Sequence, residues 1–387
     1  VTESRPPITL ATTPGPFQKE TDSITGKVVI RCGIQKRSRT FAGTGAAPIP
    51  PMVTTVLVGF EKSANSDYAH DPSSPGQLHH APLRVLMSLG SVYLKFRQTF
   101  DHGLGTAYYR DVVRPRILKT HPVEGTTDSR CEIHALTYSQ DWLNLIWTLK
   151  SFYAASGRKY ALCIHDDGSL DDAARSALQQ HFPAARLILR AEADAKLAEV
   201  LRDYPRCLKF RNTNLLAPKV FDFIAYLQSE RMGLFDSDLL FFQEPTAYLQ
   251  RIEDSSYRKN TFNADCGTSA YTIEPDVVRR HLGFELHPMV NSGLGLIHRD
   301  SMRWDWVEEF LALPGILDGH FWRIEQTIYA LCSSRFGVEL LPDEYRVYLA
   351  HGIDSRPFRH YVGAVRHLMY KEGMSTLVGQ GLLAVAG

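Results

Sequence analysis

Two aspartates, Asp236 and Asp238, stand one residue apart where an apolar run ends, in "RMGLFDSDLLFF" (residues 231–242). Carboxylates this close repel each other and are costly to bury, so they need either water or a cation beside them. A divalent ion such as Mg²⁺ or Mn²⁺ would neutralise both, and the phosphates of a substrate would complete its ligand shell. A solvated turn at a strand end has the same residues, and this pair alone favours neither interpretation.

The elements before this pair alternate between strands and helices. "CEIHALTYS" (131–139), "KYALCIH" (159–165) and "ARLILR" (185–190) predict strands. The apolar spacing of "DWLNLIWTLKSFYAASG" predicts a helix with Asp141 as its N-cap and Gly157 as its stop. This alternation predicts an α/β domain with a mostly parallel sheet, in which ligands bind at the carboxyl ends of the strands. Asp236 and Asp238 lie at such an end.

Further helices and strands are predicted on both sides of the pair. Ser169 and Asp172 have the spacing of a capping box and predict a helix start, and residues 215–230 have helical spacing. After the pair, "PMVNSGLGLIHRD" predicts a strand, and "SMRWDWVEEFLAL" predicts a helix capped by Ser301. "FWRIEQTIYALCSSRFG" predicts a helix that ends at Gly337, and "VELLPDEY" predicts a strand entering a turn.

Composition narrows the class of protein. The chain has 387 residues, of which 44% are hydrophobic and 22% charged, as in globular proteins, and a net charge of +1 gives no reason to expect nucleic acid as a partner. The six cysteines form no C-x-x-C pair, which favours free thiols in a reducing compartment. We find no transmembrane span and no secretory signal in the sequence, so we expect a cytoplasmic protein.

Residue types change along the chain and predict four parts. Residues 1–80 are rich in Pro, Gly, Ser and Thr and predict a flexible low-complexity extension. Residues 81–130 form a lead-in segment, residues 131–375 the folded domain, and residues 376–387 a C-terminal tail.

Four motifs resemble those of a known enzyme class. "LFDSDLLFF" is similar to the D-x-D strand of glycosyltransferases with the GT-A fold. "VNSGLGLIH" (290–298), "IEQTIY" (324–329) and "HYVGAVR" (360–366) are similar, in the same order, to motifs of the glycogenin-like and lipopolysaccharide-galactosyltransferase-like group. The resemblance implies a GT-A fold, which is a Rossmann-like, mixed, mostly parallel sheet flanked by helices. It also implies a metal-dependent transferase that uses a nucleotide sugar, with UDP as the expected nucleotide.

The resemblance also implies roles for particular residues. His360 would complete a metal shell begun by Asp236 and Asp238, and Mn²⁺ (or Mg²⁺) suits two carboxylates and an imidazole. Arg366, where the group has Lys, would hold the diphosphate. The catalytic candidates are Asn291, Glu325 and Gln326. Glu325 replaces the group's usual Asp, and Thr327 stands where a second acid is common.

Other residues are candidates for binding the nucleotide sugar. Thr137 and Tyr138 end the first strand, where a tyrosine ring could stack on uracil. Asp166, beside Asp167, ends the second strand, and Lys219 precedes the D-x-D strand. Ser292 and Gly293 allow hydrogen bonds at close backbone approach. The polar loop between the D-x-D and N-S-G strands holds Asn263, Asp265 and Thr268, to which the sequence assigns no particular contact.

The C-terminal motif is expected to reach the aspartates. Two carboxylates leave a divalent metal little charge to offset a diphosphate, so a further cation is useful there. We therefore predict one cluster of Asp236, Asp238, His360 and Arg366, with residues 355–370 folding over the strand end as a loop that orders when the donor binds.

Two alternatives remain open. "FDSDLL" also resembles the haloacid-dehalogenase phosphatases, although Leu239 and Leu240 follow the second Asp where that family has Gly-Thr or Gly-Val. The chain could also be a catalytically inactive sugar-binding protein with the same fold. The partner of the favoured enzyme would be a nucleotide-sugar donor, and its acceptor a lipid-linked glycan, a protein or a small molecule.

Overall fold

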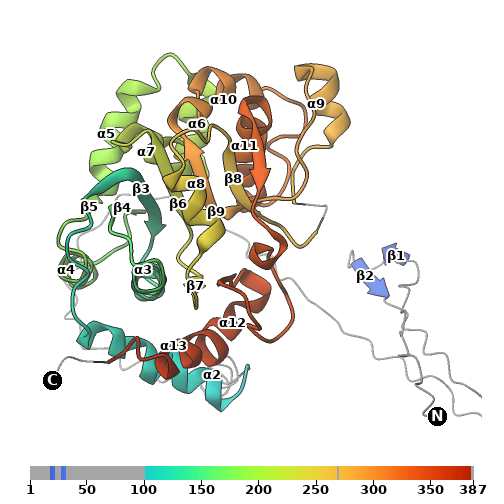
Figure 1. Cartoon of the computed structure of the whole chain (residues 1–387). Coiled ribbons are helices and arrows are strands. Elements are labelled where there is room, and N and C mark those ends of the chain that lie inside the picture. Colours follow the sequence, from blue (N-terminus) through green and yellow to red (C-terminus); the bar gives the residue numbers. More distant parts are fainter. Residues whose placement is uncertain (1–17, 22–27, 32–100, 268–269, 385–387) are drawn as a thin grey trace, which may run out of the picture. The chain divides into compact units, whose positions relative to one another are not determined.

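The computed structural model describes residues 18–21, 28–31, 101–267 and 270–384 of a chain that forms two units, residues 1–84 and 85–387 (Figure 1). In the first unit, strand β1 (Gln18–Thr21) pairs antiparallel with β2 (Val28–Arg31). Apart from these two strands, the predicted extension over residues 1–80 lies outside the described residues.

The second unit is built on one mixed sheet. Its strand order is β10-β8-β9-β6-β3-β4-β5, and β9 alone among these seven runs antiparallel to its neighbours. The predicted α/β class, with a mostly parallel sheet flanked by helices, is therefore confirmed. The strands are β3 (Asp128–Thr137), β4 (Tyr160–Asp166), β5 (Arg186–Ile188), β6 (Arg231–Phe235), β8 (Asn260–Ala264), β9 (Val290–His298) and β10 (Val338–Leu340).

The direction of β9 decides which residues meet at the edge of the sheet. Because β9 is antiparallel to β6, its first residues lie beside the last residues of β6, with Leu294 paired to Phe235. The backbone N–H of Asp236 donates to the carbonyl of Gly293 at 2.9 Å. The N-S-G segment therefore lies next to the D-x-D segment.

Helices cover both faces of the sheet (Figure 1). Side chains alternate across each strand, so the sheet supplies two separate hydrophobic clusters. One cluster includes residues of α3 (Trp142–Ser156), α4 (Asp172–His181) and α8 (Thr246–Glu253). The other includes residues of α5 (Arg190–Val200), α6 (Pro205–Thr213), α7 (Ala217–Tyr226), α9 (Pro275–Leu282), α10 (Trp304–Phe310) and α11 (Phe321–Phe336).

The predicted helices form, but three of their predicted caps differ. Asp141 precedes α3, yet its side chain makes no capping hydrogen bond. Helix α4 is capped by Asp171, which accepts from the N–H of Ala174, so Ser169 is not the cap. Ser301 lies in a separate 3₁₀ turn (Arg299–Ser301), and α10 begins three residues later, at Trp304. Each of these side chains bonds another group instead of a helix N–H: Asp141 accepts from Ser237, Ser169 donates to Asp167, and Ser301 donates to the carbonyl of His298.

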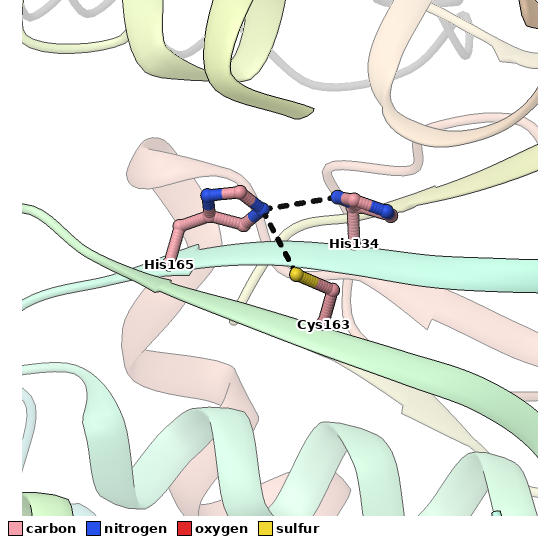
Figure 2. A group of neighbouring side chains, drawn as sticks. All are labelled: His134, Cys163 and His165. Carbon is pink, nitrogen blue, oxygen red and sulfur yellow. Dashed lines mark hydrogen bonds between the residues drawn. The ribbon is translucent and has the colours of Figure 1, made fainter. Parts of the chain in front are cut away.

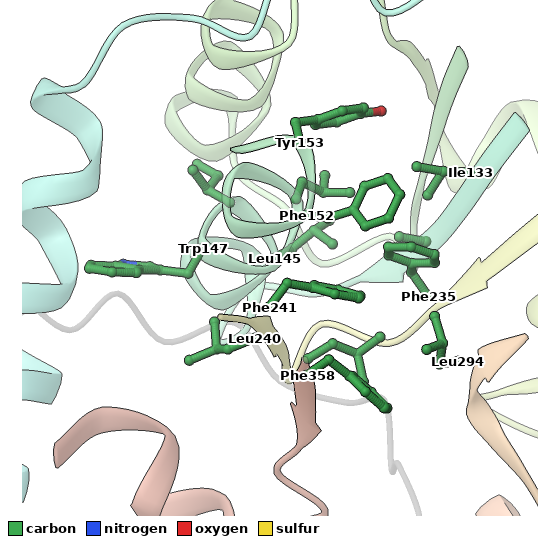
Figure 3. Close-up of a cluster of buried hydrophobic side chains, with 14 of the residues drawn as sticks. Ile133, Leu145, Trp147, Phe152, Tyr153, Phe235, Leu240, Phe241, Leu294 and Phe358 are labelled. Carbon is green, nitrogen blue, oxygen red and sulfur yellow. The ribbon is translucent and has the colours of Figure 1, made fainter. Parts of the chain in front are cut away.

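A second, two-stranded sheet follows the aspartate pair directly. Strand β7 (Leu239–Phe241) pairs antiparallel with β11 (Phe358–His360). Phe241 and Phe358 stack with ring centroids 5.5 Å apart, and Phe152 of α3 meets Phe241 edge-on at 5.1 Å (Figure 3). Burying an aromatic ring contributes about 1.5–3 kcal/mol, so this packing holds β11 firmly. The prediction of a loop over residues 355–370 was wrong in this respect.

The described unit extends beyond the predicted domain at both ends. The short helical turns over Leu104–Lys119 include α2 (Leu104–Tyr108), which contacts the turn over Met369–Met374 that follows β11. Ile117 and Leu377 belong to the buried cluster around α3. These segments bring residues from before 131 and after 375 into the fold of the second unit.

Two further findings bear on the surroundings of the chain. The five cysteines in the described residues are free thiols, namely Cys131, Cys163, Cys207, Cys266 and Cys332. None of the helices in the described part of the chain combines the length and apolarity that crossing a bilayer requires.

Candidate functional site

Asp236, Asp238 and His360 converge beyond the carboxyl end of β6. One potential ligand atom from each lies within 4.8 Å of the other two. The Nε2 atom of His360 is 3.1 Å from Oδ1 of Asp238 and 3.6 Å from Oδ2 of Asp236. The Asp236 side chain is 32% exposed and the other two are almost buried. The structure thus brings together the three residues that the sequence proposes as metal ligands.

Backbone contacts hold the aspartate loop in place. The N–H of Tyr361 donates to the carbonyl of Asp238 at 2.9 Å, which continues the β7–β11 pairing up to the site. From α3, the hydroxyl of Thr148 donates to the carbonyl of Ser237 at 2.9 Å. The segment that carries both aspartates is therefore fixed from β11 and from α3.

His360 is oriented by the N-S-G segment. Its Nδ1 atom lies 2.9 Å from Oδ1 of Asn291. An amide oxygen can only accept, so Nδ1 carries the proton in the neutral ring and Nε2 faces the carboxylates with its lone pair. A Cβ on Gly293 would stand 2.1 Å from Cε1 of His360, so the ring occupies the space that glycine leaves. Asn291 and Gly293 therefore position the imidazole.

The charges in this cluster depend on one another. Burial acts to raise the pKa of Asp238, but His360 and Arg366 outweigh it and the pKa is lowered. Burial acts to lower the pKa of His360, and Asp238 reverses this, so that the pKa is raised. Oδ1 of Asp238 is buried and has no well-aligned hydrogen bond among the described residues. The carboxylates therefore require a positive charge beside them, which is either a protonated His360 ring or a cation bound where Nε2 faces them.

Arg366 borders this cluster, as the resemblance predicts. Its Nη2 atom bonds Asp141 and lies 3.5 Å from Oγ of Ser237 and 3.7 Å from Oδ2 of Asp238. Asp141 also accepts from Ser237 Oγ at 2.7 Å. The sequence identified Asp141 only as a helix cap, because nothing in its local pattern points to a partner more than two hundred positions away.

Lys219 lies on the other side of Asp236. Its Nζ donates to Oδ1 of Asp236 at 2.8 Å and to the carbonyl of Ser292 at 3.1 Å, and it lies 3.0 Å from Oε1 of Glu325. Burial raises the pKa of Glu325 to about 7, although the Lys219 ammonium acts in the opposite direction. The sequence predicts nucleotide binding for Lys219, whereas the structure joins this amine to two carboxylates and a carbonyl. Its role toward a nucleotide stays a prediction.

Helix α11 contributes Glu325 and Gln326, which both contact Ser292 of β9 next to the aspartate loop. Ser292 Oγ donates to Oε2 of Glu325 at 2.8 Å, and the N–H of Ser292 donates to Oε1 of Gln326 at 3.2 Å. Gln326 and Asn291 each donate to Oδ2 of Asp265, at 3.2 and 3.1 Å. These amide and carboxyl groups form one network from α11 to β9.

The remaining residues of this region have structural partners. Thr327 lies on the same helix and donates to the carbonyl of Arg323 one turn earlier. Asn263 Oδ1 accepts from the N–H of Leu294 at 3.2 Å. The polar loop left open by the sequence thus contributes Asp265 to the network, while Thr268 lies outside the described residues.

The predicted nucleotide side comprises the ends of β3 and β4. Thr137 is buried, and Tyr138, directly after β3, is 36% exposed. Burial and the neighbouring Asp141 raise the pKa of Tyr138. Asp166 accepts from the N–H of Gly168 at 2.7 Å and pairs with Arg175 at 3.2 Å, which braces the loop after β4. Asp167 accepts from Ser169 in the same loop. Of these four residues, Tyr138 is the one whose pKa responds to the charges of Asp141, Arg366 and Asp238.

Comparisons with known proteins give likenesses among solved structures only. No protein-family model matches the chain, and no curated protein matches its sequence. The galactosyltransferase LgtC, solved with donor and acceptor sugar analogs, is 14% identical over 66% of this chain and 97% of its own, with a TM-score of 0.42.

Two other solved transferases give similar values. The xyloside xylosyltransferase 1 of mouse is 11% identical over 62% of this chain and 99% of its own, with a TM-score of 0.39. The mannosyltransferase Ktr4p of S. cerevisiae is 11% identical over 64% and 80%, with a TM-score of 0.39. Each likeness concerns the course of the chain and not its chemistry.

Proposed function

We propose that this protein is a metal-dependent glycosyltransferase of the GT-A type, which moves a sugar from a nucleotide sugar to an acceptor. The observation that carries the proposal is the convergence of Asp236, Asp238 and His360 within 4.8 Å at the end of β6, with Arg366 beside Asp238. These residues come from segments that only the fold unites. Their chemistry suits a diphosphate held by a cation and a guanidinium.

The cluster fits a divalent metal ion of intermediate hardness. Two carboxylates with one imidazole suit Mn²⁺, and Mg²⁺ is the second choice. Oδ1 of Asp238 is buried without an aligned donor, and Asp236 is partly exposed, so the oxygens have capacity for a cation that arrives from solvent. When bound, such an ion would act as a Lewis acid that neutralises charge on the leaving diphosphate.

The chain's own residues would share the other tasks. Arg366 is held near Asp238 by Asp141 and can turn one N–H edge toward a phosphate, because a guanidinium has five donors. Asn291 keeps His360 in the tautomer that presents Nε2. Glu325 and Gln326 are the groups we assign to the sugar and its acceptor, and Ser292 links both to β9. Tyr138 is our candidate for contact with the base.

A donor screen tests the proposal. We expect Mn²⁺-dependent nucleotide release from one member of a panel of UDP-, GDP- and CDP-sugars, with UDP as our first choice. Asp238→Asn should lower release by roughly 10³-fold, and Asp172→Asn, at a fully exposed carboxylate on α4, serves as the matched control.

Other outcomes would support the alternatives. Phosphate release from a phosphomonoester, with no nucleotide release, would favour the phosphatase. Donor binding without turnover in any acceptor extract would favour an inactive sugar-binding protein.

A further inference from the structure

A second cluster of potential ligands lies on the face of the sheet that α7 covers, away from the aspartate loop. His134 on β3 and Cys163 and His165 on β4 each offer one atom, and the three atoms lie within 4.8 Å of one another (Figure 2). Nε2 of His165 is 3.0 Å from Nδ1 of His134 and 3.4 Å from Sγ of Cys163. All three side chains are at most 2% exposed.

No single hydrogen-bonding pattern uses both contacts of His165 Nε2. Nε2 of His134 lies 3.2 Å from Oε2 of Glu132, without a well-aligned hydrogen bond among the described residues. The negative charge of that carboxylate still favours the proton on Nε2, which leaves a lone pair on Nδ1. His165 Nε2 could then donate to that lone pair, or instead accept from the Cys163 thiol. One nitrogen of a neutral ring cannot do both. A metal ion among the three atoms would use both lone pairs and the sulfur together.

The surroundings place a carboxylate at the second nitrogen of His134 and fix the ring of His165 by packing alone. A ligating histidine usually has a carboxylate or carbonyl at its other nitrogen, as Glu132 stands to His134. Glu132 is itself held by Arg186 at 2.6 Å. His165 Nδ1 has no hydrogen bond among the described residues, and this ring is fixed by packing on Phe223, with centroids 4.6 Å apart.

We propose that His134, Cys163 and His165 bind one Zn²⁺ ion. In a tetrahedral zinc site with Zn–N of about 2.0–2.1 Å and Zn–S of about 2.3 Å, neighbouring ligand atoms are about 3.3–3.6 Å apart. The two contacts of His165 Nε2, at 3.0 and 3.4 Å, need widening by a few tenths of an ångström at most. The ligand atoms of His134 and Cys163 lie within 4.8 Å of each other and would have to come to the same spacing. A thiolate with two imidazoles suits zinc and does not suit Mg²⁺ or Mn²⁺.

Three protein ligands would leave the fourth position of the tetrahedron to a water molecule, and the proposed zinc would act by joining two strands. Binding replaces the thiol proton of Cys163, which leaves to the buffer, with a Zn–S bond, and no electron is transferred. The ion would join β3 to β4 just before their carboxyl ends, since His134 is three residues from Thr137 and His165 precedes Asp166. It would thus stiffen the part of the sheet that we assign to the nucleotide. The proposal does not depend on the transferase activity.

Metal content tests the proposal directly. The whole protein is produced with zinc in the medium, dialysed against a chelator that removes loosely bound ions, and analysed by elemental mass spectrometry. We expect one zinc per chain in the wild type and in Asp238→Asn, and none in Cys163→Ala. Cys332→Ala is the matched control, because Cys332 is an equally buried free thiol in the same hydrophobic cluster. Its zinc should be retained.

X-ray absorption of the wild-type protein covers the case in which Cys163→Ala does not fold. We expect one sulfur at about 2.3 Å and nitrogen ligands at about 2.0–2.1 Å from zinc. A wild-type protein without stoichiometric zinc, a shell without sulfur, zinc retained by a folded Cys163→Ala, or copper in place of zinc would each overturn the assignment.

Discussion

The two clusters of potential metal ligands contrast in ligand chemistry and in burial. Asp236, Asp238 and His360 offer mainly oxygen at the edge of the sheet, with one carboxylate about a third exposed. The cluster of His134, Cys163 and His165 offers nitrogen and sulfur in the interior and is closed to solvent. Hard ligands open to water suit an ion that comes and goes with a substrate, whereas soft, closed ligands suit an ion held for the life of the fold.

The clusters also differ in how the chain assembles them. The interior cluster needs only two adjacent parallel strands, and Cys163 and His165 share a face because they are two residues apart. The edge cluster needs β11 to return beside β7, far from it in sequence. A site at a strand end can thus be built from distant segments, and its residues can change without disturbing the sheet. A change in the interior cluster alters side chains that pack within the sheet's core.

The largest expected effect separates the clusters by activity. Asp238→Asn should lower nucleotide release from the donor by roughly 10³-fold, since it removes one charged ligand from a site whose main task is electrostatic. Its thermal midpoint should stay close to that of the wild type, because Asn keeps the size of the side chain and its lost attraction to His360 and Arg366 is offset by the lost repulsion from Asp236. Turnover rates and melting curves provide the measurement, with Asp172→Asn as control. Undiminished turnover would remove the edge cluster from the mechanism.

Lys219 should affect stability instead. Lys219→Met leaves Asp236 and Glu325 without their shared cation, and breaking a buried ion pair from one side costs about 3–5 kcal/mol. Urea unfolding should show this loss, and the double variant Lys219→Met/Glu325→Gln should recover part of it. If the single variant is as stable as wild type, then the buried network around the edge cluster does not support the fold.

Gly293→Ala tests the fit of His360 without removing a ligand. The added Cβ would meet Cε1 of His360 at 2.1 Å, so the ring must move away from the aspartates. We expect Mn²⁺ affinity to fall by roughly 10–100-fold, as when a group that orients a metal ligand is lost. Gly379→Ala, where no atom lies within 4 Å of the added carbon, is the control. Equal Mn²⁺ affinity in both variants would contradict the assigned role of His360.

Cys163→Ala should do the reverse of Asp238→Asn. We expect a thermal midpoint roughly 4–8 °C below that of Cys332→Ala, equivalent to about 2 kcal/mol for a lost cross-link between strands. Nucleotide release below the melting range should change little, because Cys163 lies in the interior of the sheet. Equal midpoints for the two cysteine variants would mean that Cys163 contributes no more to stability than Cys332 does, and would contradict a stabilising metal ion at Cys163.

The smallest effect is expected from shortening the chain. Both clusters belong to the unit that spans residues 85–387. A protein beginning at residue 85 should therefore keep its thermal midpoint, its zinc and its nucleotide release. Loss of solubility or of most activity would show that the first unit contributes to the second.

Local sequence predicted the helices and strands well where apolar periodicity is strong. The range 141–157 was expected to be a helix, and α3 runs from Trp142 to Ser156 before a left-handed Gly157. The same signal could not place Asp141, because capping and ion pairing call for the same carboxylate and only the position of Arg366 decides between them. It also missed β11, three residues long, whose pairing with β7 depends on a distant segment.

The sequence by itself determined which chemistry was available: a D-x-D pair at a strand end, a late histidine and arginine, and an α/β alternation whose strand ends collect ligands. Only the tertiary structure decided which groups meet. The antiparallel β9 brings Gly293 against His360. Lys219, on α7, reaches both Asp236 after β6 and Glu325 on α11. The interior cluster of His134, Cys163 and His165 depends equally on strand register. The reason is that side-chain type and spacing are local properties, whereas contact across a sheet is set by strand direction and register.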